Sequence, residues 1–541
     1  MMPMQNPFRV FLSGNEAVAL AAAHHNITRG TGYPGTPSSE ILPALHSHGV
    51  AAEWAPNEKV AAEVALGVAF AGGRALVTMK HVGFNVAADP LFTAAYSGVS
   101  GALVIACADD PGLASSQNEQ DTRSLAKAAG IPVVEPSDVQ EAYDYTRIAF
   151  RISEKWGIPV ILRLTTRVCH TGGIVSGTYQ AEPPPVLAFT RPIEQSVMVP
   201  AHARPAHKVL RGKLAAIARW NNEEGPFKVY GPSDATLAIV TSGVSSLHAQ
   251  EAAPDASILS LGLTYPLPMD RIRAFTKDRK RILAVEENDP YLSESLRAAG
   301  IPAETNPESF RHGELNVVRV RRLIAGQPEP DAPPPRAKPP ALCKGCPHTQ
   351  VFGLLRDVDA IVAGDIGCYT LGALPPLRAL HTQLCMGASI GMGLGLRHTL
   401  PEKEARKVVS VIGDSTFLHT GINGLIEMAY NPPPTGHIIL VLDNGTTAMT
   451  GQQENPGTGR NIDHNPARRI LIEDLARACG IEDVRVFHPT READALRTAL
   501  AEACEDDRLH FFVARQPCVL ISGRGRSQKT ETANCPTPAS A

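Results

Sequence analysis

The residues best suited to chemistry follow two neighbouring predicted strands near the C-terminus. The apolar run 408–412 ends at Asp414, and after a helical pattern the apolar run 438–442 ends at Asn444. A strand, a crossover helix and a second strand predict parallel strands whose carboxyl ends meet at one edge of a sheet, where ligands of such sheets bind. The carboxylate and the amide can then share a hard cation such as Mg²⁺, which prefers oxygen ligands and is commonly bound together with phosphate.

A Gly-Asp pair with an asparagine after the next strand resembles the Mg²⁺-diphosphate motif of thiamine diphosphate (ThDP) enzymes. In those enzymes the aspartate and the asparagine hold the Mg²⁺ that binds the diphosphate. An ordinary strand–helix–strand unit with polar turn residues is the alternative, and this motif alone does not separate the two. The choice therefore depends on the rest of the chain.

Length and composition restrict the class of protein. A chain of 541 residues predicts two to four domains, and its 43% hydrophobic and 19% charged residues are typical of a soluble globular protein. The formal net charge of −3 gives no reason to expect nucleic-acid binding. We recognise no signal peptide and no membrane-spanning run, and the ten scattered cysteines suggest thiols or metal ligands rather than disulfides. A cytoplasmic protein that binds neither nucleic acid nor membrane is expected.

Hydrophobic patterns predict three α/β regions joined by one linker. Residues 1–185 predict a helix over 60–71 and strands over 75–79, 102–106 and 159–162, and residues 186–326 predict strands over 237–243, 257–261 and 281–285. Residues 180–235 show no clear pattern beyond a basic helical stretch. The Pro-rich segment 327–341 predicts a semi-rigid linker, residues 342–521 a third α/β domain, and the polar segment 522–541 a disordered tail.

Eight blocks of sequence match one family in the same order. They are YPGTPSSEI (33–41), EWAPNEKVAAEVALG (53–67), LVTMKHVGFNVAADP (76–90), VIACADDPGLASSQNEQDTR (104–123), CKGCPH (343–348), GDIGCYTLGALPP (364–376), CMGASIGMGLG (385–395) and GDSTFLHTG (413–421). On these blocks the chain resembles the α subunits of indolepyruvate ferredoxin oxidoreductases, which belong to the ThDP-dependent 2-oxoacid:ferredoxin oxidoreductases. The resemblance implies an α/β fold class with two ThDP-binding-fold parallel sheets: a pyrimidine-binding domain (1–185) and a diphosphate-binding domain (342–521), with a transketolase-C-terminal-like domain (186–326) between them.

The resemblance implies that Glu58 is the catalytic glutamate. In the family this residue hydrogen-bonds the aminopyrimidine ring of ThDP and favours the imino tautomer, whose nitrogen can take the proton from the reacting carbon. A buried carboxyl suits that task. Glu53 and Glu63 are the competing residues, and a solvated glutamate at a helix start is the alternative interpretation. ThDP is expected between the first and third domains, within one chain or across a dimer.

For the third domain the resemblance implies a Mg²⁺ site with Asp414 and Asn444 as side-chain ligands and the Thr446 carbonyl as a third. Backbone N–H groups at glycine-rich helix starts suit phosphate oxygens. The candidate diphosphate neighbours on this basis are Gly413, Ser415, Gly387 and Ser389. Close helix–sheet packing is the alternative reason for a glycine at position 387.

Three further residues are expected at the reacting end of the cofactor. Thr36 matches a family position that faces the reacting carbon, and Lys80 and His81 follow a predicted strand at the same edge. A histidine in such a place is more often structural. Beside the cofactor we favour a role for His81 in substrate binding or proton transfer.

The substrate loop departs from the pattern of pyruvate-using relatives. Ser116 and Gln117 occupy the loop in which those relatives place an arginine for the substrate carboxylate, whereas this chain has no arginine between Asp109 and Asp121. A different carboxylate-binding group, or a larger substrate, is expected.

Four cysteines match cluster-ligand positions of the pyruvate-oxidising relatives: Cys343, Cys346, Cys368 and Cys518. The Cys-x₂-Cys spacing of the first two lets both thiolates reach one centre, and four cysteines are the usual ligands of a [4Fe–4S] cluster. A structural Zn²⁺ site and ordinary buried thiols are the alternatives, and His348 could replace one cysteine. We favour iron, because a ThDP carbanion with no recognisable flavin motif needs a one-electron acceptor nearby.

The resemblance implies oxidative decarboxylation of an aryl (indolepyruvate-like) or branched 2-oxoacid with coenzyme A, giving acyl-CoA and CO₂. Electrons would pass through the cluster to ferredoxin or another partner. The main alternative is a non-oxidative ThDP-dependent decarboxylase or lyase. A catalytically silent subunit is a third, opposed by the presence of Glu58, Asp414 and Asn444.

The resemblance also implies partner subunits. The family needs a γ-type domain, usually on a small β subunit, and we recognise none here, so an α₂β₂ assembly is expected. The family's α subunit typically ends in a ferredoxin-like domain with eight cysteines. After Cys518 this chain has only Cys535, so a different route for the electrons is expected.

Overall fold

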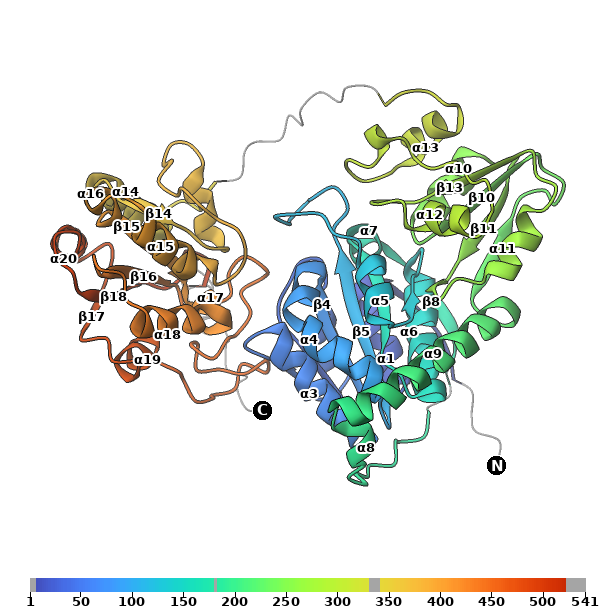
Figure 1. The fold of residues 1–541 in the computed structure, drawn as a ribbon, viewed down its shortest axis with the longest axis horizontal. Helices are drawn as coiled ribbons and strands as arrows, with labels where there is room; N and C mark the ends of the chain where they lie inside the picture. The colour runs from blue at the N-terminus through green and yellow to red at the C-terminus, as the bar shows by residue number, and fades with distance from the viewer. Residues whose placement is uncertain (1–5, 180–181, 330–340, 522–541) are drawn as a thin grey trace, which may run out of the picture. The chain divides into compact units, whose positions relative to one another are not determined.

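The computed structural model describes residues 6–179, 182–329 and 341–521 (Figure 1). It divides into two compact units, Met1–Pro334 (unit 1) and Pro335–Ala541 (unit 2). Most of the predicted linker and the whole predicted tail lie outside the described residues. Among the helices that are described, none is both long and apolar enough to cross a bilayer.

Unit 1 begins with a seven-stranded sheet of order β12-β6-β7-β5-β4-β2-β3. Its strands are β2 (Arg29–Gly32), β3 (Ala52–Trp54), β4 (Arg74–Lys80), β5 (Ala102–Asp109), β6 (Val133–Val134), β7 (Val160–Thr165) and β12 (Leu263–Tyr265). All neighbours are parallel except β12, which runs antiparallel to β6. The central strands β5 and β7 are buried along their whole length, as continuous apolar runs in a covered parallel sheet require.

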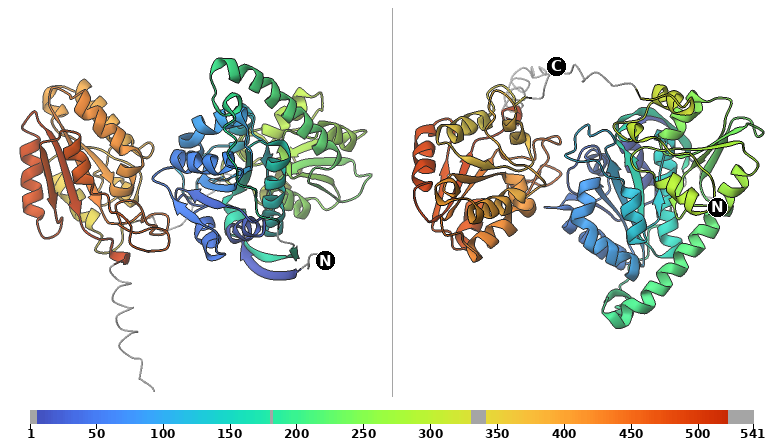
Figure 2. Two further views of the ribbon diagram at one scale, coloured as in Figure 1. Left: turned by 90° about the horizontal axis from the view of Figure 1, so that it is seen from below. Right: turned by 45° about the horizontal axis from the view of Figure 1, so that its top comes forward.

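Helices cover this sheet in pairs. The main ones are α1 (Gly14–His24), α3 (Glu58–Phe70), α4 (His81–Ser97), α5 (Thr122–Ala129) and α6 (Val139–Trp156), of which α1 packs on α6 and α3 on α4. β1 (Asn6–Ser13) and β8 (Gly172–Tyr179) form a separate antiparallel ribbon near the N-terminus (Figure 2). The strands predicted at 75–79, 102–106 and 159–162 and the helix predicted at 60–71 are confirmed.

The rest of unit 1 is a four-stranded sheet of order β13-β10-β11-β9, in which only β9 is antiparallel to its neighbour. The strands are β9 (Phe227–Tyr230), β10 (Leu237–Ser242), β11 (Ser257–Leu261) and β13 (Arg281–Val285), and the helices are α10 (Ser245–Ala252), α11 (Met269–Thr276), α12 (Tyr291–Ala298) and α13 (Val317–Ile324). Alternate residues such as Ile239 and Val240 enter two different cores, one on each face of the sheet.

The region 180–235 of unit 1 contains α8 (Ile193–Ser196), which was not predicted, and the long helix α9 (Pro200–Glu223), conspicuous in the right-hand view of Figure 2. α9 confirms the predicted basic helical stretch and extends it at both ends. One further feature of unit 1 was not predicted. Strand β12, which belongs to the predicted middle domain, joins the N-terminal sheet. The first two predicted domains therefore share one sheet.

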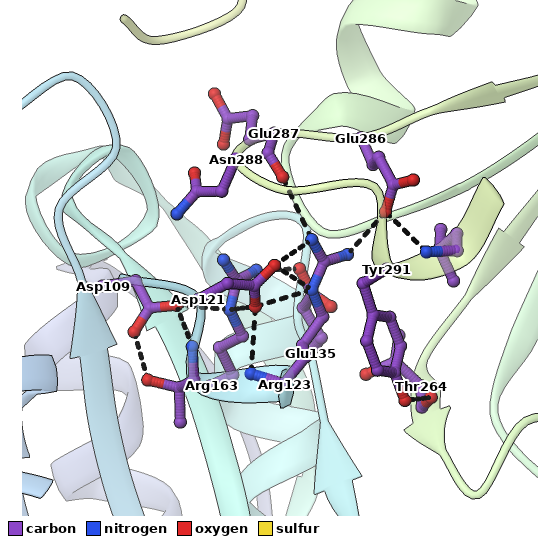
Figure 3. A network of polar contacts seen from close by, with 12 residues as sticks. Asp109, Asp121, Arg123, Glu135, Arg163, Thr264, Glu286, Glu287, Asn288 and Tyr291 are labelled. Atoms are coloured by element: carbon purple, nitrogen blue, oxygen red, sulfur yellow. Dashed lines mark hydrogen bonds and ion pairs between the residues drawn. The ribbon is translucent and has the colours of Figure 1, made fainter. Parts of the chain in front are cut away.

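A buried polar network joins the N-terminal sheet to the turn after β13 (Figure 3). Arg163 Nε donates to Asp109 at 2.7 Å, and Arg123 Nη2 donates to Asp121 at 2.6 Å and to the Glu287 carbonyl at 3.0 Å. Five buried carboxyl groups belong to this region: Asp109, Asp121, Glu135 and Glu286 form ion pairs with the two arginines, and the Glu287 carboxyl accepts a hydrogen bond from Leu315 N instead. Two cations do not neutralise five carboxylates, so we expect the pKa of at least one of these carboxyl groups to be raised.

Glu287 is the carboxyl in this region with the clearest rise in pKa. Burial, followed by the nearby Glu314 carboxylate, raises its pKa from 4.5 to about 7. The native carboxyl therefore holds its proton more tightly than the unfolded one, and it costs stability as the pH rises from about 4.5 through 7. We expect Glu287→Gln to raise the free energy of unfolding by roughly 1–3 kcal/mol at pH 8 and by much less at pH 5, measured by urea denaturation. A loss of stability at both pH values would contradict this expectation.

Unit 2 is a five-stranded parallel sheet of order β14-β15-β16-β18-β17. The strands are β14 (Ile361–Ala363), β15 (Val408–Gly413), β16 (His437–Asp443), β17 (Asp483–Phe487) and β18 (Leu509–Arg515), and the helices include α14 (Pro347–Asp357), α15 (Ala388–Thr399), α18 (Ile422–Tyr430), α19 (Ile472–Ala478) and α20 (Ala493–Ala503). α14 packs on α20 and α15 on α18, over two separate cores. The predicted strand–helix–strand unit is confirmed, since β15 and β16 are parallel neighbours.

Candidate active site

The carboxyl ends of β2, β3, β4 and β5 lie along one edge of the N-terminal sheet. Thr36 follows β2, Glu58 follows β3, Lys80 ends β4, and the loop with Ser116 and Gln117 follows β5. Parallel pairing in the order β5-β4-β2-β3 places all of these positions at that edge. The predicted residues, which are far apart in the sequence, therefore lie on neighbouring turns along one edge of this sheet.

Glu58 is the buried member of the three candidate glutamates. It is the first residue of α3, whose preceding residue Asn57 accepts a hydrogen bond from Val60 N at 2.9 Å and so fixes where the helix begins. Glu58 is 4% exposed, whereas the Glu53 and Glu63 side chains are 43% and 44% exposed and form ion pairs with surface cations. Burial favours Glu58 for a function that needs a carboxyl out of water.

Gly83 on α4 is the close neighbour of the Glu58 side chain. A Cβ atom at position 83 would lie 2.5 Å from Glu58 Oε1 and 2.9 Å from its Cδ. Real Cβ contacts are not that short, so any other residue at 83 would displace the carboxyl. The glycine in this helix is explained by the space that Glu58 needs.

We expect Gly83→Ala to lower the activity of the chain by at least tenfold through displacement of Glu58, while the chain stays folded. The matched control is Gly67→Ala on α3, where an added Cβ meets nothing within 4 Å. In that exposed helix position alanine should stabilise the fold by roughly 0.5–1 kcal/mol and leave activity unchanged. Steady-state rates and urea denaturation of both variants test this. A Gly83→Ala enzyme as active as wild type would show that the position of the Glu58 carboxyl does not matter.

Lys80 and Thr36 border the same edge. The aliphatic part of Lys80 lies against Gly35, whose added Cβ would be 3.1 Å from Lys80 Cγ. Burial lowers the pKa of Lys80, and the Asp110 and Glu58 carboxylates oppose that shift. Thr36 is half-buried, and its carbonyl accepts a long hydrogen bond of 3.5 Å from Ser115 Oγ.

Asp110 organises the substrate loop, and sequence reasoning missed it. Its Oδ2 accepts hydrogen bonds from Ser115 N at 2.8 Å and from Ser116 Oγ at 2.7 Å, and its Oδ1 accepts one from Thr166 Oγ1 at 2.7 Å. The predicted substrate residue Ser116 is therefore held by Asp110, whereas Gln117 is exposed. Two consecutive aspartates after a strand were the available signal.

His81 is completely buried at the start of α4. Its Nε2–H donates to the Asn118 carbonyl at 3.1 Å, and its Nδ1 is buried without a hydrogen bond to any described residue. Burial lowers the pKa of His81, so the ring is held neutral. The observed contact fixes the substrate loop, and a direct role in proton transfer stays a prediction.

In unit 2, Asp414 and Asn444 meet at the carboxyl ends of β15 and β16. Asp414 Oδ2 and Asp443 Oδ1 both accept hydrogen bonds from Gly445 N, each at 3.1 Å. Burial and the neighbouring Asp443 carboxylate raise the pKa of Asp414 well above its usual range. Arg515 forms its ion pairs with Asp443 and Glu473, which leaves Asp414 without a cation among the described residues. A buried carboxylate with no counter-charge fits a site for a metal ion.

The other predicted metal and diphosphate positions lie around this pair. Asn444 and Thr446 are buried, and Asn444 Oδ1 accepts a hydrogen bond from Thr446 N at 3.1 Å. Ser415 Oγ hydrogen-bonds Thr447 Oγ1 at 2.8 Å. Gly413 lies against Tyr369, whose ring would be 2.8 Å from an added Cβ.

Asp365 occupies the helix start that the sequence assigned to diphosphate. Its carboxylate accepts hydrogen bonds from Gly387 N at 2.8 Å and from Ser389 N at 2.9 Å, at the beginning of α15. Gly387 has a φ of +85°, and an added Cβ would lie 2.1 Å from Thr420 Oγ1. Close packing thus accounts for the glycine, and contact of Gly387 and Ser389 with a diphosphate stays a prediction.

The four predicted cluster cysteines line a single cavity of unit 2, together with His348 and Asn444. Burial and the neighbouring thiols raise the pKa of Cys368 to about 11. Cys518 N donates to the Asn444 carbonyl at 3.0 Å, which joins the last cysteine directly to the predicted metal-binding turn. Across residues 6–179, 182–329 and 341–521, no three His, Cys, Asp or Glu side chains are arranged to hold a metal ion. The four thiols therefore line one cavity, but their positions in this structure are not those of ligands around a bound metal.

His348 also lines this cavity. It is buried at the start of α14, and burial lowers its pKa to about 4. Its ring makes an edge-to-face contact with Tyr369, the residue after Cys368. The histidine is therefore neutral and packed beside the cysteines.

Comparisons with known families and proteins agree with this geometry. Residues 21–215 match the family described as pyruvate flavodoxin/ferredoxin oxidoreductase, thiamine diP-bdg, and residues 365–514 match the thiamine pyrophosphate enzyme, C-terminal TPP binding domain. One match lies in each unit. They confirm the predicted ThDP-binding α/β fold.

Curated relatives cover nearly the whole chain. Indolepyruvate oxidoreductase subunit IorA of Archaeoglobus fulgidus is 40% identical over 96% of this chain and 88% of its own length. The protein of the same name from Pyrococcus abyssi is 41% identical over 95% of this chain and 86% of its own length. Ketoisovalerate oxidoreductase subunit VorB of Methanothermobacter marburgensis is 25% identical over 58% of this chain and 98% of its own length.

Proposed function

The chain belongs to the IorA family of indolepyruvate oxidoreductase subunits, and from that premise we propose that it catalyses the oxidative decarboxylation of an aryl 2-oxoacid with coenzyme A. The products are an acyl-CoA and CO₂, and the electrons leave through one [4Fe–4S] cluster. The observation that carries this proposal is the cavity in unit 2, where four cysteines lie beside the Asn444 turn. A non-oxidative ThDP enzyme would have no use for that arrangement.

Glu58 is proposed to act on the pyrimidine side of ThDP. When bound, ThDP supplies a nucleophilic carbon and an electron sink for the loss of CO₂. The Glu58 carboxyl, buried against Gly83, would hydrogen-bond the pyrimidine ring and promote removal of the proton from the reacting carbon. Thr36 and Lys80 border the same edge and would orient the substrate there.

Asp414 and Asn444 are proposed to hold Mg²⁺, with the Thr446 carbonyl as a further ligand. The donor set fits, because the buried Asp414, which no cation of the described residues pairs with, lies beside amide and carbonyl oxygens. Gly413 ends β15 and Ser415 follows it at the same edge, so both would lie next to the diphosphate oxygens.

The four cavity cysteines fit a [4Fe–4S] cluster by their chemistry. All the ligand groups would be thiolates, and the cavity lies next to the proposed diphosphate-binding turn through the Cys518–Asn444 hydrogen bond. His348, neutral and packed beside Tyr369, would form part of the wall around the cluster. Such a cluster accepts electrons one at a time.

The substrate class is proposed from the loop and from the relatives. The described loop between Asp109 and Asp121 contains no cationic side chain that could pair with a carboxylate as in pyruvate-using relatives. The IorA relatives, whose name specifies indolepyruvate, are far more similar to the chain than the ketoisovalerate-named relative. An aryl side chain is therefore favoured over a branched one.

Partners follow from the subunit name of the relatives. We propose a smaller β subunit that supplies the γ-type domain, in an α₂β₂ assembly, and ferredoxin or another electron-transfer protein as acceptor. Co-purification of the chain from its native cell without a smaller partner would contradict this part of the proposal.

Iron and acid-labile sulfide analysis of anaerobically purified protein tests the cluster. We expect about four of each per chain, and loss of both in Cys343→Ser and Cys368→Ser. Cys479→Ser is the matched control, because Cys479 is half-buried against the core that contains Phe417 and Phe511 and does not line the cavity. Zinc without sulfide, or an active colourless enzyme, would favour the non-oxidative decarboxylase or lyase instead.

A further inference from the structure

The substrate loop, residues 110–121, is held by the second sheet of unit 1 as well as by its own sheet. On the side of its own sheet, Asp110 binds Ser115 and Ser116, and His81 binds the Asn118 carbonyl. These contacts fix the first half of the loop and its middle. At the exit of the loop, Asn85 on α4 donates to the Gln120 side chain at 3.0 Å, and Thr122 N donates to Asp109 at 3.1 Å. The Gln120 backbone carbonyl is bound from the second sheet instead.

The turn between β13 and α12 supplies that second anchor (Figure 3). Asn288 Nδ2 donates to the Gln120 carbonyl at 3.1 Å. Arg123, just beyond the loop, donates to the Glu287 carbonyl at 3.0 Å and forms an ion pair with Glu286 at 3.5 Å. The turn at residues 286–290 (EENDP), although distant in sequence, therefore contacts the C-terminal end of the substrate loop.

The segment that follows the second sheet, residues 313–314, also packs against the beginning of the substrate loop. Gly112 has a φ of +80°, and an added Cβ would lie 2.9 Å from Glu314 N, so the loop backbone passes directly against the Gly313–Glu314 backbone. The next residue, Leu113, is a non-glycine residue at φ +58°. A side chain in that region is uncommon and persists where the surroundings enforce the conformation.

Asn288 itself is built for this contact. Its φ is +64°, a conformation that asparagine tolerates better than most residues. It is 8% exposed, so the hydrogen bond to Gln120 is made out of water. Its backbone shape and its side-chain amide both serve the one contact with the loop.

We propose that Asn288 is a positioning residue for the 2-oxoacid: it holds the exit of the substrate loop so that Ser116 and its neighbours present a fixed surface to the substrate. This inference rests on the proposed function, because it assigns the substrate side to that loop. It gives the second sheet of unit 1 a role in substrate binding, although none of the proposed cofactor-binding residues lies on that sheet.

The test compares Asn288→Gly with Asn288→Asp in the complete enzyme. Glycine keeps the positive φ and removes the whole side chain, including the amide donor, whereas aspartate keeps the shape and places a carboxylate against the Gln120 carbonyl. We expect KM for indolepyruvate to rise about tenfold with glycine and further with aspartate. KM for coenzyme A, kcat and ThDP retention should change less than twofold. The matched control is Asn221→Ala, which removes buried hydrogen bonds to the Leu263 and Pro266 carbonyls away from the loop and should leave KM unchanged.

Hydrogen–deuterium exchange of the full chain gives a readout that needs no turnover. Amides of residues 112–120 should exchange at least fivefold faster in Asn288→Gly than in wild type, and those of the rest of unit 1 should not. An unchanged KM, unchanged exchange of the loop, or exchange raised equally across unit 1 would each overturn the proposal. If the wild-type enzyme turns over no 2-oxoacid, the proposed function fails, and loop exchange still decides whether Asn288 holds the loop.

Discussion

A chain carrying Glu58→Gln should retain ThDP with unchanged affinity and release CO₂ from its 2-oxoacid at least 100-fold more slowly than wild type. Glutamine preserves the size of a side chain that is packed against Gly83, so the fold and the cofactor site should survive. The amide cannot promote proton removal as a carboxyl does, and acid–base catalysis by one positioned group is worth about 10²–10⁴-fold. Radiometric CO₂ release and ThDP retention after gel filtration measure the two properties separately.

Glu63→Gln is the matched control for this experiment. Glu63 lies on the same helix, with its side chain 44% exposed and paired with Lys59 on the surface. Its replacement should change neither property, because exposed ion pairs contribute at most about 1 kcal/mol to stability. Normal CO₂ release by Glu58→Gln would remove Glu58 from the catalytic role and reopen the choice among the glutamates.

Asp414→Asn should have two effects of opposite sign. Mg²⁺-dependent retention of ThDP should fall at least tenfold, because a metal ligand loses its charge. In EDTA at pH 8, the free energy of unfolding should rise, because the native chain then no longer buries the Asp414 charge beside Asp443. The raised pKa of Asp414 gives the sign: the ionised form is disfavoured in the folded state, so removing it stabilises the metal-free fold.

Asp443→Asn is the matched comparison for Asp414→Asn. Asp443 is paired with Arg515 at 2.6 Å, and its loss leaves a half-buried guanidinium with Glu473 alone. This variant should be less stable than wild type in EDTA. Urea denaturation and ThDP retention of both variants decide the matter, and Asp414→Asn that retains ThDP normally would contradict the metal site.

The sequence predicts the elements of this fold well where local signals agree. Continuous apolar runs marked the buried strands, so the strand predicted at 75–79 corresponds to β4 and the one at 438–442 to β16. The turn residues Asp414 and Asn444 then meet because both strands are parallel neighbours. Topology follows from pattern here, since a strand–helix–strand unit has few ways to pack.

What the sequence could not predict depends on contacts between distant segments. Strand β12 joins the N-terminal sheet although its short apolar run lies within the pattern of the second sheet. Asp365 takes the N–H groups of Gly387 and Ser389, which by local pattern alone are free to bind phosphate. Asn288 reaches the substrate loop from a turn far along the chain. No local periodicity records such pairings.

The most direct test of the central claim is product analysis under anaerobic conditions. The complete enzyme is incubated with indolepyruvate, ThDP, Mg²⁺, coenzyme A and oxidised methyl viologen as a one-electron acceptor. We predict one equivalent of acyl-CoA for every two equivalents of viologen reduced. When the viologen is left out, the iron–sulfur absorption should bleach in a reaction that requires both ThDP and the 2-oxoacid. An aldehyde formed in place of acyl-CoA, with the absorption unchanged, would contradict the oxidative function.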